Sequence, residues 1–257
     1  MLNKRPCALS IAGFDPSGGA GVLADIKTFE ALGIYGFGIC SAITVQNDIS
    51  FKKVAWLDLA LMEEQFRVLT ERFEIPCVKI GLIENLQTLA AVIGFLKAYD
   101  KDIKIICDPV LKASAGFDFH PLWELKNLEE ICKNLFLLTP NRDEIKKLLP
   151  GLEAGASAEQ LSKYCAVLLK DGHGEGEEVL DKLYAHKAVI EFPAKRIING
   201  AKHGSGCVLS AAVTGYIAIG NGLQEACNLA RNYMNAYLSS TESLLGFHAY
   251  KEKECLT

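Results

Sequence analysis

The chain lacks a strong charge bias and any long hydrophobic run. Its 257 residues carry a formal net charge of −4, and its 27 Lys and Arg residues form no basic cluster. Nucleic-acid-binding domains typically present such a cluster, as do proteins that bind anionic membrane surfaces. The apolar stretch near the N-terminus is too short for a signal peptide, and no stretch resembles a transmembrane span. The sequence therefore predicts a cytoplasmic protein with neither nucleic acid nor membrane as a partner.

Paired cysteines are also lacking. The nine cysteines are spread singly between Cys7 and Cys255, and no C-x-x-C pair occurs. This spacing argues against a zinc ribbon and against a disulfide scaffold. Apolar neighbours surround several of them, as in Ile105-Ile106-Cys107. We expect reduced thiols in the core of a cytosolic protein.

The chain does contain a regular alternation of short apolar runs with longer amphipathic segments. The runs predict strands, with a hairpin late in the chain, over residues 7–12, 37–44, 77–80, 103–107, 135–138, 166–169, 179–184 and 188–192. The segments with helical spacing predict helices over residues 22–33, 59–72, 86–96, 125–133, 206–219 and 223–240. Ser157 and Gln160 predict a capping box for one further short helix.

This alternation indicates an α/β fold, with a mostly parallel central sheet, helices on both faces and a late antiparallel hairpin. The hydrophobic fraction of 50% is enough for a substantial core. No linker or repeat divides the chain, so one domain over residues 1–257 is expected.

In an open α/β sheet, ligands bind beyond the carboxyl ends of the strands. The first predicted strand is followed there by a glycine-rich segment, residues 13–21, which matches neither a Walker loop nor a Rossmann fingerprint. We interpret it as backbone lying against a flat substrate, with Asp25 on the next helix as a polar contact. A structural turn with a helix cap is the alternative. Gln46 follows the next strand, and its amide suits the edge of a nitrogen heterocycle, although a solvated loop glutamine fits the same position.

Three further strand ends carry polar side chains. Asp108 follows one strand, and Asn141 and Glu144 follow another, three residues apart at a predicted helix start. Amide and carboxylate oxygens suit Mg²⁺, but the same two residues would also form a capping box, and the two roles are compatible. Lys170 ends a further strand, where it can reach a nucleotide phosphate as a point charge or lie on the surface.

The segment His203-Gly204-Ser205-Gly206-Cys207 precedes a predicted helix. The two glycines allow a tight turn that directs several N–H groups to one point, and the unpaired N–H groups of a helix N-terminus favour phosphate. We expect this positive field to lower the pKa of the Cys207 thiol and to make the thiolate available. An ordinary helix start with a small buried cysteine is the alternative.

Taken in this order, the segments resemble those of the ribokinase-like superfamily, and most of all the hydroxymethylpyrimidine/phosphomethylpyrimidine kinases of thiamin biosynthesis. The resemblance covers essentially the whole chain and rests on the stretches AGFDPSGGAGVLADIKTFEALGIYG, QN, VKIG, CDPV, LTPNRDE, KDGH and HGSGC. It implies a ribokinase-like three-layer fold, ATP and Mg²⁺ as cofactors, and a homodimer. The implied reaction transfers the γ-phosphoryl group of ATP to 4-amino-5-hydroxymethyl-2-methylpyrimidine, and then to its monophosphate.

The resemblance also implies roles for residues. Cys207 stands where sugar kinases of the superfamily carry a catalytic aspartate, so it is implied as the base for the substrate hydroxyl. The N–H groups of Gly204, Ser205, Gly206 and Cys207 are implied to stabilise the transferring phosphoryl group. The residues implied around the pyrimidine are Gly13, Ala20, Asp25, Thr44, Gln46, Leu82 and Val110. Those implied near Mg-ATP are Asp108, Asn141, Glu144 and Lys170, with Glu144 and Asn141 as direct or indirect Mg²⁺ ligands.

The chain departs from the family's pattern at four residues and in the short stretch between Leu152 and Ala166, where we expect a shortened helix. Phe14 stands where small hydroxyl residues are usual, and Leu82 replaces the common methionine. Asp171 puts a negative charge beside Lys170, and Lys202 replaces a threonine and adds a positive charge near the expected phosphates. These departures bear on substrate preference and on ATP affinity.

Two other functions compete with this one. Some enzymes of the family phosphorylate pyridoxal, another flat ring that bears a hydroxymethyl group, so a pyridoxal kinase is the nearest alternative. Gln46 favours an aminopyrimidine edge. A non-catalytic binding domain that kept the fold is the other alternative, but such a domain has no need of a base at Cys207.

Overall fold

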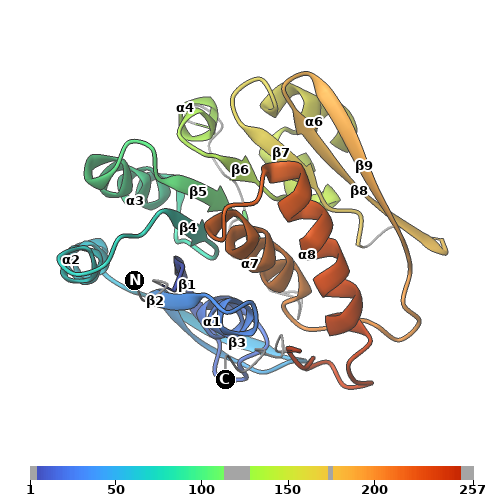
Figure 1. Ribbon diagram of the computed structural model, residues 1–257, viewed down its shortest axis with the longest axis horizontal. Coiled ribbons are helices and arrows are strands. Elements are labelled where there is room, and N and C mark those ends of the chain that lie inside the picture. The colour runs from blue at the N-terminus through green and yellow to red at the C-terminus, as the bar shows by residue number, and fades with distance from the viewer. Residues whose placement is uncertain (1–4, 113–127, 173–175, 250–257) are drawn as a thin grey trace, which may run out of the picture.

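The computed structural model describes residues 5–112, 128–172 and 176–249, which form one sheet between two layers of helices (Figure 1). The strands are β1 (Cys7–Phe14), β2 (Tyr35–Gln46), β3 (Phe51–Trp56), β4 (Cys77–Ile80), β5 (Lys104–Cys107), β6 (Leu137–Leu138), β7 (Ala166–Leu169), β8 (Glu178–Ala185) and β9 (Ala188–Lys195). The helices are α1 (Gly21–Ala31), α2 (Leu59–Thr70), α3 (Leu86–Tyr99), α4 (Leu128–Lys133), α5 (Arg142–Leu148), α6 (Ala154–Leu161), α7 (Ser205–Ala218) and α8 (Leu223–Leu238).

The sheet has the strand order β3-β2-β1-β4-β5-β6-β7-β8-β9. The six strands from β2 to β7 in this order pair in parallel, so their carboxyl ends meet at one edge of the sheet. The outer strands β3, β8 and β9 pair antiparallel. The predicted fold class is therefore confirmed, including the late hairpin, which is β8 and β9.

The core lies on both faces of the sheet. Helices α2 to α6 pack on one face of the sheet, and α1, α7 and α8 pack on the other (Figure 1). Each face has one cluster of buried apolar side chains. Helix α7 packs against α1 and α8 and against β1, β4 and β5. Ten of its fourteen residues, Val208 to Ile217, are buried, because the segment is apolar or small on every side. Its N-terminus is thereby fixed at the edge where the parallel strands end.

One strand was omitted from the sequence prediction, and one expectation about local structure is wrong. Strand β3 was not expected: it is an edge strand with lysines exposed at Lys52 and Lys53, so it lacks the apolar run of a buried strand. The expected capping box at Ser157 does not form, because α6 begins at Ala154 and buries Ser157 inside the helix, where its hydroxyl has no hydrogen-bond partner. Residues 125–127 of one expected helix lie outside the described residues, and α4 covers the rest.

Cys77, Cys107, Cys132, Cys165 and Cys227 are buried free thiols, as expected for reduced cysteines in the core. In the part of the chain that the structure describes, no helix combines the length and the apolar character that crossing a bilayer requires.

Candidate active site

Several of the strand ends that the sequence marks as functional meet around one cavity. The cavity is lined by Gly13, Ala20, Gly21, Thr44, Gln46, Leu82, Val110, Lys112, His203, Gly204 and Cys207. All the residues implied around the pyrimidine are in this lining, with the exception of Asp25. The Asp25 carboxylate is fully buried behind the cavity, where it pairs with the ammonium of Lys79.

The glycine-rich loop after β1 is held by Asp15, a residue for which the sequence interpretation gave no role. Its buried carboxylate accepts hydrogen bonds from the N–H groups of Ser17 and Ala20, each at 2.9 Å, and from His203 Nε2 at 2.9 Å. Burial opposes the charge on Asp15, but the hydrogen bonds from His203, Ser17 and Ala20 outweigh it and lower the pKa of this carboxyl. The Asp-Pro-Ser sequence, typical of an Asx turn, was the available signal. Asp15 thus ties the loop to the turn before α7.

The turn before α7 needs its glycines. Gly204 caps the helix with φ of 69°, and a Cβ there would lie 2.1 Å from the carbonyl oxygen of Gly19. A Cβ on Gly206 would lie 3.3 Å from Lys170 Nζ. The cap has no side chain to accept a hydrogen bond. The Ser205 N–H donates to the carbonyl oxygen of Lys202 at 3.3 Å, which leaves the N–H groups of Gly206 and Cys207 to a ligand. This turn lies between the glycine-rich loop and Lys170, and its role as an anion cradle stays a prediction.

The expectation of an acidic thiol at Cys207 is wrong. Burial raises the pKa of the Cys207 thiol to about 11, and the carboxylates of Asp108 and Asp25 act in the same direction. The ammonium of Lys79 and a hydrogen bond from the Gly21 N–H act against them without prevailing. The helix N-terminus is therefore only one part of the electrostatic field at this sulfur.

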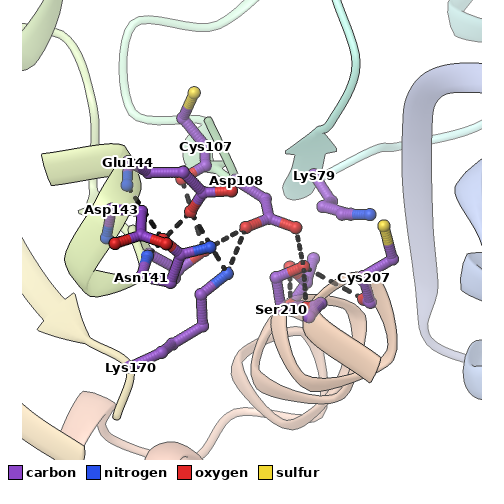
Figure 2. A network of polar contacts seen from close by, with 12 residues as sticks. Lys79, Cys107, Asp108, Asn141, Asp143, Glu144, Lys170, Cys207 and Ser210 are labelled. Carbon is purple, nitrogen blue, oxygen red and sulfur yellow. Dashed lines mark hydrogen bonds and ion pairs between the residues drawn. The ribbon is translucent and has the colours of Figure 1, made fainter. Parts of the chain in front are cut away.

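On the far side of α7's N-terminus, Asp108, Glu144 and Lys170 form a buried charged network (Figure 2). Lys170 Nζ donates to Asp108 Oδ1 at 2.7 Å and lies 3.9 Å from Glu144 Oε2, and Ser210 Oγ donates to Asp108 Oδ2 at 3.1 Å. Burial opposes the charge on Lys170, but Asp108 and Glu144 overcome this and raise its pKa. Burial raises the pKa of Glu144 well above its usual range, with Lys170 as the main opposing charge.

The capping role expected as an alternative for Asn141 and Glu144 is confirmed. Asn141 Oδ1 accepts the N–H groups of Asp143 and Glu144 at 2.9 and 2.8 Å, and Glu144 Oε2 accepts the N–H of Asn141 at 2.7 Å. The amide oxygen of Asn141 is thus committed to the helix start, whereas Glu144 Oε1 stays available. Within the described ranges, no three His, Cys, Asp or Glu side chains form a cluster that could hold a metal ion unaided.

Three of the four residues that depart from the family's pattern have local explanations. The charge of Asp171 is countered by Arg142, whose Nε lies 3.0 Å from Asp171 Oδ1. Lys202 directs its ammonium to the carbonyl oxygen of Thr241 at 2.6 Å and does not line the cavity. Phe14 does not line it either, and its carbonyl oxygen accepts a hydrogen bond from Thr44 Oγ1 at 2.8 Å. The fourth, Leu82, lines the wall so closely that a Cβ on Gly13 would lie 2.9 Å from Leu82 Cδ2.

The sheet order, the three layers and the cradle at α7 define a kinase of the ribokinase-like fold. Solved structures agree with this class. A phosphomethylpyrimidine kinase from Clostridium difficile 630 matches with a TM-score of 0.74 and 29% identity, over 90% of this chain and 98% of that one. A pyridoxal kinase from Bacillus subtilis, solved with ADP, matches with a TM-score of 0.78 and 25% identity, over 91% and 92% of the two chains.

The sequence narrows the class further. Residues 15–250 match the phosphomethylpyrimidine kinase family. The hydroxymethylpyrimidine/phosphomethylpyrimidine kinase of Rhizobium meliloti (strain 1021) is 34% identical over 246 residues, which cover 92% of each chain. The chain belongs to the phosphomethylpyrimidine kinase family and is a phosphotransferase.

Proposed function

We propose that the protein uses ATP to phosphorylate the hydroxymethyl group of 4-amino-5-hydroxymethyl-2-methylpyrimidine, and then the monophosphate so formed, in thiamin biosynthesis. One observation carries this proposal above the others. A small cavity that holds Gln46 and Cys207 opens onto the uncapped N-terminus of α7, with the Asp108–Lys170–Glu144 network on the other side. The names of the related kinases support the pyrimidine as the phosphoryl acceptor. The ADP complex of the B. subtilis relative supports an adenine nucleotide as the phosphoryl donor.

In this proposal the cavity orients the pyrimidine. The ring lies between the apolar side chains of Leu82 and Val110, and the Gln46 amide pairs with its amino and ring-nitrogen edge. The hydroxymethyl group then faces Cys207 and the cradle formed by Gly204, Ser205 and Gly206. Its oxygen attacks the γ-phosphorus while the bond to the departing ADP oxygen breaks, and its proton passes to Cys207 Sγ.

The N–H groups at the start of α7 hold the oxygens of the phosphoryl group as it moves. Lys170 lies beside this cradle and supplies a fixed positive charge to the phosphates. The donor set fits Mg²⁺, since a hard carboxylate oxygen of Glu144 is free to hold it and the remaining ligands would come from phosphates and water. Asn141 acts on the ion only indirectly, because its oxygen caps α5. When bound, Mg²⁺ neutralises charge that develops on the phosphates.

We further propose that residues 1–257 act as one kinase domain in the cytoplasm, as a homodimer without nucleic-acid or membrane partners. The continuous sheet favours a single domain. Ile43, Val45 and Ile49 favour a self-association surface, because they leave 41%, 51% and 70% of their surface exposed at β2 and the turn that follows it.

The proposed substrate is tested against pyridoxal in one assay. We expect kcat/KM for the pyrimidine to exceed that for pyridoxal, measured by coupled release of ADP. We expect Gln46→Leu to lower kcat/KM for the pyrimidine about tenfold, the scale of one lost hydrogen bond with its partner left unpaired, and to change that for pyridoxal less. The control is Gln65→Leu on α2, where the amide bonds only to the carbonyl oxygen of Leu61. Preference for pyridoxal by orders of magnitude in the unmodified protein would exclude the pyrimidine as the substrate.

The proposed Mg-ATP role of Glu144 is tested by Glu144→Gln. Glutamine can accept the same N–H of Asn141, so the capping box remains while the charge is lost. We expect KM for Mg-ATP to rise about 10–100-fold, the scale of a charge-assisted contact, with pyrimidine affinity unchanged by calorimetry. Glu153→Gln is the control, since Glu153 stands at the N-cap position of α6 without a side-chain capping bond and is exposed. Equal losses for nucleotide and pyrimidine would leave Glu144 only its structural role.

A further inference from the structure

A fully buried ion pair lies directly behind the cavity. Lys79 on β4 donates to both carboxylate oxygens of Asp25 on α1, at 2.6 and 2.7 Å, and neither side chain is exposed to solvent. Asp25 also accepts a hydrogen bond from Ser10 Oγ on β1. Lysine is almost never fully buried unless it is paired. Such a pair is rarely a net gain in stability over apolar packing, so it calls for another explanation.

The third partner of this pair is Cys207. Figure 2 shows the ammonium of Lys79 directed toward the sulfur of Cys207 at the start of α7. The interaction is reciprocal: Lys79 acts to lower the pKa of Cys207, and Cys207 acts with Asp25 to raise the pKa of Lys79, which burial alone would lower. The single charge of Lys79 is thus shared between a carboxylate and a thiol.

We propose that Lys79, held in place by Asp25, is a positioning residue for Cys207. The ammonium of Lys79 stabilises the Cys207 thiolate, which accepts the substrate's proton. This inference rests on the proposed function, in which Cys207 is the base. It gives Asp25 a different task from contact with the pyrimidine. Because neither Lys79 nor Asp25 lines the cavity, their effect on substrate passes through Cys207.

The charges around Cys207 explain why Lys79 matters. The groups that act on its sulfur are Lys79 from β4, Asp25 from α1, Asp108 after β5, Lys170 after β7 and Tyr237 from α8. Lys170 is already paired with Asp108, and Lys79 with Asp25, so a thiolate adds one uncompensated negative charge to a buried neutral group. Removing one charge of the Lys79–Asp25 pair therefore shifts the pKa of Cys207. Loss of Lys79 raises this pKa, and loss of the Asp25 charge lowers it.

The test measures the reactivity of Cys207 in the free protein. Alkylation by iodoacetamide is followed against pH, with peptide mass spectrometry to separate Cys207 from the other cysteines. Thiolate is the reacting form. We expect Lys79→Met to slow alkylation of Cys207 at pH 8 about three- to tenfold, and Asp25→Asn to accelerate it by a similar factor, as for a pKa shift of about one unit. Lys182→Met, which breaks an exposed lysine–carboxylate pair on β8, should leave the rate unchanged.

The same variants are assayed for turnover. We expect kcat to fall about tenfold in Lys79→Met at pH 8 and to recover as pH rises, with KM for the pyrimidine changed less than about twofold. If Lys79→Met does not fold, the double variant Asp25→Asn/Lys79→Met decides. It leaves no buried charge unpaired and should still slow alkylation, because Lys79 acts on Cys207 more strongly than Asp25 does.

The outcomes separate this inference from the function on which it rests. Alkylation rates that respond to neither single variant, or that change in the same direction in both, would overturn the coupling of Lys79 to Cys207. A purely structural ion pair gives that result. If the alkylation rates change as expected but the pH profile of kcat does not, then Lys79 is coupled to Cys207 and Cys207 is not the base. An increase in KM for the pyrimidine that is confined to Asp25→Asn would instead show that Asp25 contacts the pyrimidine, and would overturn its role in holding Lys79.

Discussion

Replacing Cys207 by alanine should lower kcat about 10²–10⁴-fold, the usual range for loss of a general base. The sulfur lines the cavity at the first turn of α7, next to the N–H groups that would hold the phosphoryl group. Removing it takes away the proton acceptor and leaves the cradle, the walls of the cavity and the nucleotide side intact. Pyrimidine binding, measured by calorimetry, should therefore survive while turnover, measured by ADP release, does not.

Two variants separate proton acceptance from packing. Cys207→Ser keeps a polar group of similar size, but a hydroxyl loses its proton far less readily than a thiol. Too little alkoxide forms to serve as the base, so we expect this variant to be nearly as slow as alanine. Cys227→Ala removes a buried thiol from α8, outside the cavity lining, and should keep its activity. Turnover of Cys207→Ala within about twofold of the unmodified protein would rule out the base role.

The high pKa of Cys207 gives the same idea a pH signature. The dependence of kcat/KM on pH reports groups of the free enzyme. Desolvation, together with the carboxylates of Asp108 and Asp25, raises the pKa of the Cys207 thiol to about 11. The active form is the deprotonated one, so kcat/KM should increase with pH through the mildly alkaline range. In Cys207→Ala this increase should be absent.

The position of the site could be predicted because topology converts order along the chain into proximity. Gln46, Asp108 and Lys170 are far apart in sequence, but each ends a strand of one parallel sheet. The carboxyl ends of parallel strands share an edge, so residues placed there come together without any knowledge of side-chain packing. The turn before α7 could be predicted for a different reason, since its glycines and its helix are adjacent in sequence.

Properties that depend on distant partners could not be predicted. Asp25 follows a loop of substrate-binding appearance, and nothing nearby indicates that Lys79, 54 residues away, pairs with it inside the protein. The pKa of Cys207 is a similar case, because the local helix field predicts the wrong direction. Its value is set by burial and by Asp25 and Asp108, which reach the sulfur from other elements.

The cradle itself should fail when Gly204 is replaced by alanine. The added Cβ would lie 2.1 Å from the carbonyl oxygen of Gly19 and 2.7 Å from Ala20 Cα, and backbone atoms cannot yield as a flexible side chain does. Either the first turn of α7 or the loop that lines the cavity must move. We expect kcat to fall about 10²–10³-fold, the scale for loss of one donor that stabilises transition-state charge, and KM for the pyrimidine to rise because Ala20 lines its pocket.

The matched control lies at the other end of the same helix. Gly220 also has a left-handed backbone, with φ of 107°, but no atom lies within 4 Å of a Cβ built there. Gly220→Ala therefore introduces the same kind of backbone strain, about 1–2 kcal/mol, without displacing the loop. Thermal melting should report a loss of stability in both variants, whereas kinetics should report a loss of turnover in Gly204→Ala alone. Equal turnover in the two would mean that phosphoryl transfer does not depend on the close approach of this turn to the glycine-rich loop, and that the cradle at α7 is only a helix start.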